Sequence, residues 1–308
     1  MNACIRAVVR SAIQQNWEVL GIDNGYTGII EGSMKPLVRN SVSNIIQRGG
    51  TILNTSRSEQ FKTKEGMKKA NQNLCKEGVE GVIAIGGDGT FTGALEFTGI
   101  YDIPFIGIPG TIDNDLFGTD FTIGYDTAIN TVVSCVDKIR ETADSHNRVF
   151  IIEVMGRDVG FIALRSGIAV GAEAVLIPEK TTDIGGVKKM LEYSAKQGKR
   201  SNIIIVAEGD DGGGAMELAN RLGEMHNDYE IKVSILGHVQ RGGAPSCMDR
   251  VLASRLGVAA VQALAHGKKN IMVGTNHRDI CHTPFFKAIK HHKEVNKHLL
   301  EIIEVLTL

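Results

Sequence analysis

The sequence Ile83-Ala84-Ile85-Gly86-Gly87-Asp88-Gly89-Thr90 predicts a buried strand, a glycine turn and the start of a helix. Glycines let the backbone approach a phosphate, and the N–H groups at a helix N-terminus attract an anion. Thr90 can cap this helix, and the carboxylate of Asp88 can hold Mg²⁺ between phosphate groups. A plain turn with an N-cap is the alternative, but the strand–turn–helix context favours a phosphate or nucleotide site.

Short apolar runs recur along the rest of the chain, separated by helical patterns. The run Ile203–Val206 is entirely β-branched, which is typical of a parallel strand buried on both faces. Strands are predicted at 17–22, 79–85, 104–108, 149–154, 174–177, 202–207, 233–236 and 271–274. Helices are predicted at 1–15, 41–47, 65–76, 90–97, 127–142, 187–196, 215–225, 249–265 and 285–308. This alternation predicts an α/β fold.

Composition excludes several classes of protein. The chain has 308 residues, with 34 Lys and Arg against 35 Asp and Glu. This balance gives no bulk attraction to nucleic acid or to an anionic membrane, and no apolar run approaches the length of a membrane helix. The scattered cysteines predict free thiols in a reducing cytosol, and therefore a cytoplasmic location. They are Cys4, Cys75, Cys135, Cys247 and Cys281.

A second polar loop, Pro109-Gly110-Thr111-Ile112-Asp113-Asn114-Asp115, follows the next predicted strand. Active sites of α/β enzymes lie at the carboxyl ends of strands. One of the two carboxylates can accept a hydroxyl proton while the other serves a metal. An Asx-rich turn explains the same spacing equally well.

Basic loops follow three further apolar runs. Arg57 comes after 51–53, Arg157 ends the Met155-Gly156-Arg157 turn, and His238 and Arg241 lie in the glycine-flanked loop 237–243. Single arginines after strands are most often surface residues, but several such loops fit an anionic substrate better. Glu208, at the end of the 203–207 run, can bind a sugar hydroxyl or cap a helix.

Five motifs, IAIGGDGT, PGTIDND, EVMGR, VAEG and GHVQRGGAP, occur in this order, followed by Asp249-Arg250. Together they resemble the ATP-dependent 6-phosphofructokinases of the bacterial type over nearly the whole chain. The resemblance implies two α/β sandwich domains with mostly parallel sheets. Residues 1–124 plus 240–290 would form the larger, nucleotide-binding domain, and 125–239 plus 291–308 the smaller, sugar-phosphate-binding domain.

The resemblance implies transfer of the ATP γ-phosphate to the 1-hydroxyl of fructose 6-phosphate, with Mg²⁺ as cofactor. Asp113 matches the general base and Thr111 its neighbour, while Arg57 and Arg157 match arginines that neutralise the moving phosphoryl group. The implied substrate-binding residues are Asp115, Met155, Arg148, Glu208, Lys232, His238 and Arg241. The implied nucleotide-binding residues are Tyr26, Arg57, Ser58, Gly87, Asp88, Gly89, Thr90, Thr92 and Gly93, with Asp88 also linked to the metal.

The resemblance further implies a homotetramer with active and effector sites shared between subunits. Arg148 would reach the 6-phosphate of a neighbouring subunit's substrate. Lys232 stands where a second such arginine is usual, and Asn44 stands where effector binding commonly uses an aspartate. The implied effector residues are Arg6, Arg10, Arg39, Arg140, Glu173, Lys199 and Arg200.

The helical pattern at residues 1–15 has no strand before it, whereas the family begins with a strand and a glycine-rich loop. The expected missing segment is about fifteen residues, one strand and one loop. This keeps a catalytically weak regulatory subunit open as an alternative. A pyrophosphate-dependent enzyme is the other alternative, although Gly89 and Gly110 favour ATP because those enzymes usually carry Asp and Lys there.

Overall fold

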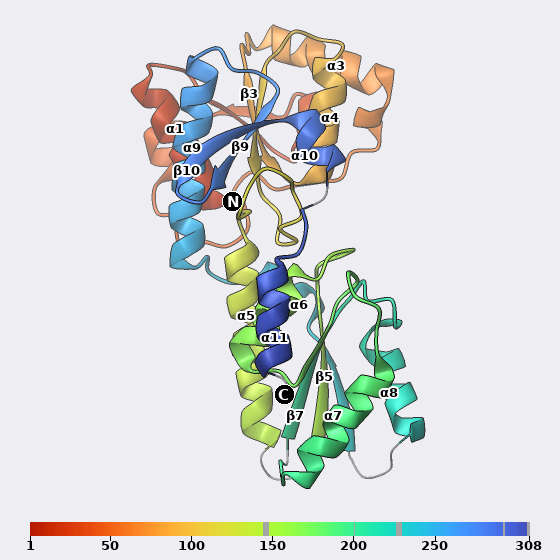
Figure 1. The fold of residues 1–308 in the computed structure, drawn as a ribbon. Helices are drawn as coiled ribbons and strands as arrows, with labels where there is room; N and C mark the ends of the chain where they lie inside the picture. The colour runs from red at the N-terminus through yellow and green to blue at the C-terminus, as the bar shows by residue number, and fades with distance from the viewer. Residues whose placement is uncertain (144–147, 200, 226–229, 292, 307–308) are drawn as a thin grey trace. The chain divides into compact units, whose positions relative to one another are not determined.

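The computed structural model describes residues 1–143, 148–199, 201–225, 230–291 and 293–306. The chain divides into two compact units. Unit 1 comprises residues 1–111, 116–124 and 244–293, and unit 2 comprises residues 112–115, 125–243 and 294–308. Each unit has a sheet with helices on both faces (Figure 1), so the predicted α/β architecture with mostly parallel sheets is confirmed.

Unit 1 is built on a four-stranded sheet of order β10-β9-β4-β3. The strands β3 (Val82–Gly86), β4 (Phe105–Pro109) and β9 (Ile271–Asn276) are parallel, and β10 (Asp279–Pro284) pairs antiparallel with β9. All of β4 is buried, because its side chains alternate between two cores. A short hairpin pairs β1 (Leu20–Ile22) with β2 (Met34–Pro36) around α2 (Tyr26–Glu31).

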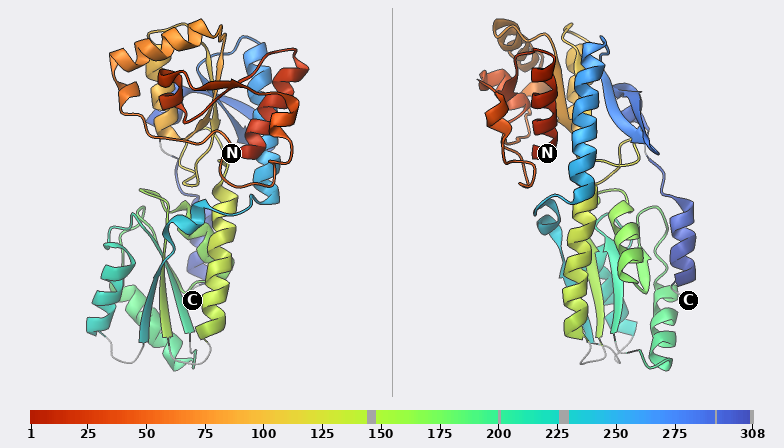
Figure 2. Two further views of the ribbon diagram at one scale, coloured as in Figure 1. Left: turned by 180° about the vertical axis from the view of Figure 1, so that it is seen from behind. Right: turned by 90° about the vertical axis from the view of Figure 1, so that its left-hand side faces the viewer.

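Helices cover both faces of this sheet. Helices α3 (Lys64–Lys76), α4 (Asp88–Thr98) and α10 (Phe285–Lys290) contribute to the core that contains Phe105. Helices α1 (Asn2–Gln14) and α9 (Cys247–Ala265) lie side by side over the other face, against Ile106 and Ile108 (Figure 2). The carboxyl ends of β3 and β4 lead into the two polar loops predicted from the sequence.

Unit 2 has a fully parallel sheet of order β6-β7-β5-β8. Its strands are β5 (Arg148–Val154), β6 (Ala174–Leu176), β7 (Ser201–Ala207) and β8 (Glu230–Ile235). The run Ile203–Val206 is completely buried, because α5 (Tyr125–Ala143) and α6 (Phe161–Val170) cover one face while α7 (Ile184–Lys196) and α8 (Gly214–Met225) cover the other. Helix α11 (Lys297–Leu306) packs against α6.

Three predictions of local structure are wrong. Residues 41–47 are not a helix: a single 3-10 turn, η1 (Arg39–Val42), ends there, and Asn44 has a φ of 54°, a conformation that a right-handed helix excludes. The predicted helix 285–308 is two helices, α10 and α11, because His291 is extended. Thr90 is no N-cap: α4 begins at Asp88 after Gly87, and Thr90 lies within its first turn.

Apart from the short 3-10 helices, two helices and two strands among the described residues were not predicted. Helix α6 has apolar residues around most of its circumference, so it lacks the one-sided pattern that reveals a surface helix. The others are α2, β2 and β10. All three are short, and β10 is also largely polar. Within the described part of the chain, no helix is both long and apolar enough to cross a membrane.

Candidate active site

The loops after β3 and β4 lie against each other in unit 1. The N–H of Gly110 donates to the carbonyl of Gly86 at 2.8 Å, which continues the strand pairing into the loops. A Cβ atom on Gly87 would lie 3.5 Å from Cβ of Thr111. The predicted nucleotide loop and the start of the predicted catalytic loop therefore occupy one edge of the sheet.

The N-terminus of α4 is open to a ligand. Its N-cap is Gly87, and no side chain in the described residues caps it. Asp88 and Gly89 are exposed, and a Cβ atom on Gly89 would meet nothing within 4 Å. Uncapped N–H groups with the positive end of the helix dipole attract phosphate.

Tyr26 packs beside this helix. Its ring stacks on Phe61 with centroids 3.9 Å apart, and its hydroxyl donates to the carbonyl of Thr90 at 2.5 Å. Burial raises the pKa of Tyr26 well above its usual value, so the phenol stays protonated. Gly93 gives the ring room, since a Cβ atom there would lie 2.9 Å from it. The structure thus brings Tyr26, Thr90 and Gly93 together.

The other predicted nucleotide residues lie around this core. Thr92 donates from its hydroxyl to the carbonyl of Asp88 at 3.0 Å. Arg57 is exposed on the segment before α3, and Ser58 Oγ accepts a hydrogen bond from the N–H of Phe61 at 3.3 Å.

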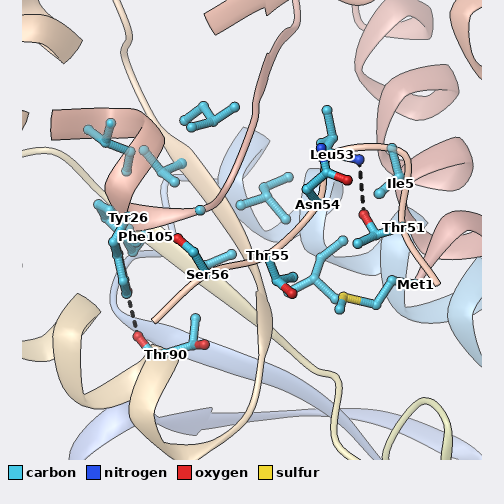
Figure 3. Close-up of a pocket in the computed structure, with 17 residues that line it drawn as sticks. Met1, Ile5, Tyr26, Thr51, Leu53, Asn54, Thr55, Ser56, Thr90 and Phe105 are labelled. Atoms are coloured by element: carbon cyan, nitrogen blue, oxygen red, sulfur yellow. Dashed lines mark hydrogen bonds between the residues drawn. The ribbon is translucent and has the colours of Figure 1, made fainter. Parts of the chain in front are cut away.

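A cavity of about 200 Å³ runs beside β3 in unit 1 (Figure 3). Tyr26 and Thr90 line it, but most of its lining is apolar and includes Met1, Ile5 and Leu53. Ligand sites usually have volumes of about 300–1,000 Å³. The cavity is therefore smaller than a usual ligand site, and no charged side chain lines it.

The predicted general base lies in unit 2. Asp113 is only 2% exposed, and its Oδ2 lies 3.4 Å from Nε of Arg157. The next residue, Asn114, has a φ of 56° and is also buried, which makes a tight turn between Asp113 and the half-buried Asp115. A buried carboxylate beside an exposed guanidinium suits both proton transfer and charge stabilisation.

The loop after β5 carries Arg157 and is held by two side chains. Glu208 Oε1 accepts hydrogen bonds from the N–H groups of Gly156 at 3.2 Å and Arg157 at 2.8 Å. Gln240 Oε1 accepts one from the N–H of Met155 at 3.1 Å. Sequence reasoning missed Gln240; its only signal was a neutral amide within the GHVQRGG motif. His238 and Arg241 are exposed beside it on the 3-10 helix η3 (Gly237–Arg241).

Arg148 and Lys232 lie at the opposite end of the same sheet. Both contact Glu230: Arg148 Nε lies 2.6 Å from one carboxylate oxygen and Lys232 Nζ 2.6 Å from the other. β5 is seven residues long, so about 20 Å of parallel strand separates Arg148 from the loop at Met155. A single copy of unit 2 therefore does not bring these two cations to His238 and Arg241.

The predicted effector residues fall into two groups. In unit 1, burial and the charges of Arg6 and Arg39 lower the pKa of Arg10, whose Nε is buried with no hydrogen-bond partner among the described residues. In unit 2, Arg140 donates to the carbonyl of Val170 at 2.6 Å, and Glu173 binds Lys199 and the N–H of Ile203. Arg200 lies outside the described residues.

The candidate site combines parallel sheets that end in glycine-rich and acidic loops with an uncapped helix N-terminus and exposed cations. These features define a class of α/β proteins that handle phosphate groups. Residues 1–264 match the family model of phosphofructokinase. The chain belongs to the phosphofructokinase family.

Three relatives place the chain within that family. It is 53% identical to ATP-dependent 6-phosphofructokinase 1 of Thermus thermophilus, over all of this chain and 95% of that protein. It is 49% identical to ATP-dependent 6-phosphofructokinase 2 of Bacteroides thetaiotaomicron, over all of this chain and 94% of that protein. The solved phosphofructokinase of Saccharomyces cerevisiae aligns with all of this chain at a TM-score of 0.88 and 34% identity, and this chain spans 45% of its length.

Proposed function

We propose that this chain transfers the γ-phosphate of ATP to the 1-hydroxyl of fructose 6-phosphate, giving fructose 1,6-bisphosphate in glycolysis. The observation that carries the proposal is the buried Asp113 carboxylate facing the Arg157 guanidinium, at the end of the PGTIDND loop. The names of relatives about half identical over the full chain support the same activity.

Asp113 accepts the proton of the attacking hydroxyl. Its burial keeps water away from the carboxylate, so the proton that it takes comes from a bound substrate. Arg157 balances the negative charge that develops on the moving phosphoryl group, which is where phosphoryl transfer needs most stabilisation.

The uncapped N-terminus of α4 and the two glycine loops bind the phosphates of ATP. Asp88 presents an exposed carboxylate at this place, and Thr111 begins the neighbouring loop. Mg²⁺ usually takes one or two carboxylates and completes its shell with substrate phosphates and water, so the residues present fit it. Bound there, Mg²⁺ would neutralise phosphate charge.

The sugar phosphate binds at the carboxyl end of the unit 2 sheet. His238 and Arg241 are exposed there and can bind an anion, and Glu208 and Met155 flank the same loop. In this assignment, unit 1 binds the nucleotide and unit 2 binds the sugar phosphate.

A second copy completes the sugar-phosphate site. Arg148 and Lys232 form a cationic pair, but they lie at the amino end of their sheet, about 20 Å along β5 from Met155. Their contribution to a 6-phosphate therefore requires another subunit, as in the homotetramer implied by the sequence. The partnerless buried Nε of Arg10 supports an anionic effector in unit 1, since an anion would supply its missing acceptor.

A coupled assay for fructose 1,6-bisphosphate tests the function, with ATP and then pyrophosphate as donor. We expect turnover with ATP and Mg²⁺ and none with pyrophosphate, because Gly89 leaves open space where an aspartate would narrow the nucleotide path. Turnover with pyrophosphate alone would assign the chain to the pyrophosphate-dependent enzymes. Turnover with neither donor would refute the catalytic proposal.

A further inference from the structure

Two substrate-facing loops meet at the carboxyl end of the unit 2 sheet, and one buried side chain lies between them. The first loop is Met155–Arg157 after β5, and the second is η3 after β8. Gln240 on η3 is 1% exposed, whereas its neighbours His238 and Arg241 are exposed. The amide therefore points into the protein while the flanking cations face outward.

The amide of Gln240 joins the two loops by hydrogen bonds of opposite polarity. Its Oε1 accepts from the buried N–H of Met155 at 3.1 Å, and its Nε2 donates to the carbonyl of Gly237 at 3.0 Å. Rotating the amide by 180° would set donor against donor and acceptor against acceptor. One orientation therefore satisfies a buried N–H of the first loop and a carbonyl of the second.

The first loop has a conformation that needs such support. Gly156 has a φ of 151° and Arg157 a φ of 54°, a region that a residue with a side chain adopts only when its surroundings impose it. Gln240 binds the N–H of Met155, and Glu208 binds those of Gly156 and Arg157. These two side chains thus hold three consecutive N–H groups, and the loop places Arg157 against Asp113.

We propose that Gln240 is a positioning residue that fixes the spacing between Arg157 on the first loop and the substrate-binding cations His238 and Arg241 on the second. Gln240 itself contacts neither substrate, because it is buried. The kinetic part of this proposal rests on the proposed function; the structural part, the joining of the two loops, does not.

Gln240→Met tests the proposal, since methionine fills a similar volume and makes neither hydrogen bond. We expect kcat/KM for fructose 6-phosphate to fall about tenfold or more, because small misplacements of catalytic groups have large effects on rate. The KM for ATP should stay within about twofold, since unit 1 is untouched. Gln240→Asn, which keeps the amide but is one methylene too short to span both loops, should give a smaller loss in the same direction.

Asn202→Leu is the matched control. Asn202 is a completely buried amide at the start of β7, where its Oδ1 accepts from Ser194 Oγ at 2.6 Å, at the opposite end of the sheet from the loops. Replacing this amide by leucine should change the thermal stability of the protein but not its kinetic constants. If Asn202→Leu loses kcat/KM as Gln240→Met does, the defect reflects stability alone and the positioning role is refuted.

Amide hydrogen exchange gives a readout that needs no activity. We expect faster exchange in segments 155–157 and 237–241 of Gln240→Met than in the parent chain, and parental exchange there in Asn202→Leu. Unchanged exchange in both segments would overturn the proposal even in an active enzyme. Faster exchange in a chain that lacks kinase activity would refute the proposed function and leave the joining of the loops standing.

Discussion

At the scale of single residues, Asp113 combines burial with a nearby positive charge. Its carboxylate is 2% exposed and faces Arg157 at 3.4 Å. Such a carboxylate, shielded from bulk water and paired with a guanidinium, can take a proton from a substrate hydroxyl. We therefore expect Asp113 to act in proton transfer, and Arg157 beside it to act in stabilising the transferring phosphoryl group.

Asp113→Asn should lower kcat by about 10²–10⁴, the usual contribution of general-base catalysis, with little change in either KM. The isosteric amide keeps the side-chain volume but cannot accept the proton. Steady-state kinetics with both substrates, together with the Tm as a check of folding, measure the effect. A folded variant with nearly parental kcat would exclude Asp113 as the base.

Gly89 makes a second residue-scale prediction, about the donor. A side chain there would enter open space at the N-terminus of α4, where an acidic residue also suits the helix dipole, so substitution should not harm folding. We expect Gly89→Asp to raise the KM for ATP about tenfold or more, because its carboxylate would repel the phosphates.

Gly89→Asn is the control for size, since it adds the same volume without the charge. It should raise the KM for ATP less than Gly89→Asp does. Equal values in the parent chain and Gly89→Asp would show that phosphates do not pass this position. Equal increases in both variants would attribute the effect to volume alone.

At the scale of elements, an ion pair at the amino ends of β5 and β8 connects the two strands. Glu230 is hydrogen-bonded by Lys232 on its own strand and by Arg148 on β5, and these bonds lower its pKa to about 2. Arg148 and Glu230 are also direct partners in the parallel register. The pair therefore joins the edge strand β8 to the centre of the sheet.

This pairing predicts a pH-dependent contribution to stability. Because the folded pKa of Glu230 lies below the unfolded value of about 4.3, its stabilisation is present above that pH and is lost as the pH falls towards 2. Glu230→Gln should therefore lower the Tm slightly at pH 7, and the difference from the parent should shrink between about pH 4 and pH 2. The effect is small because the carboxylate is nearly half exposed.

Glu59→Gln is a suitable control, because Glu59 pairs with Lys62 within one exposed turn and joins no two strands. Its Tm should match that of the parent more closely. A Tm difference for Glu230→Gln that is constant from pH 7 to pH 2 would contradict the ionic origin of the effect.

Elements with a strong local pattern were predictable from the sequence, and others were not. The run Ile203–Val206 indicates a strand buried on both faces because only β-branched residues occur in it, and β7 has that environment. Helix α6 is similarly buried, but a helix that is apolar all round has no periodicity to reveal it. The end of η1 depends on the left-handed backbone of Asn44, which no pattern of hydrophobicity encodes.

The candidate site also has features that the sequence predicts and features that it does not. Motif resemblance predicts Asp113 and Arg157 as site residues, because it identifies residue types at fixed positions, and the structure brings the two side chains together. Their separation of 3.4 Å was not predictable, since it depends on how Gln240 and Glu208 fix the loop after β5. Likewise, the sequence could not show that Arg148 and Lys232 share Glu230, because residues 148 and 230 meet only through the register of two strands.

At the scale of the whole chain, the edge strand β3 of the unit 1 sheet is only partly buried. β3 is the last strand of its sheet and pairs on one side with β4. Beside it lies the cavity of about 200 Å³, lined by residues 82–85 and by Met1.

An extension of about fifteen residues engineered ahead of Met1, one strand and one loop long, should stabilise the protein if its strand is rich in Val and Ile. The added strand can pair with the edge of β3 that lies away from β4, and can fill the cavity. We expect the Tm to rise by about 2 °C or more, since filling a cavity of this size is worth more than about 1 kcal/mol.

A Gly/Ser extension of equal length is the control, because it adds the same number of residues but neither fills the cavity nor forms a strand readily. Hydrogen exchange of the β3 amides should slow in the Val/Ile form and remain parental in the control. Equal Tm values for the two extensions would assign the gain to the added length rather than to strand pairing. An unchanged Tm in both would show that the edge of β3 is stable as it stands, and that the cavity accepts no further strand.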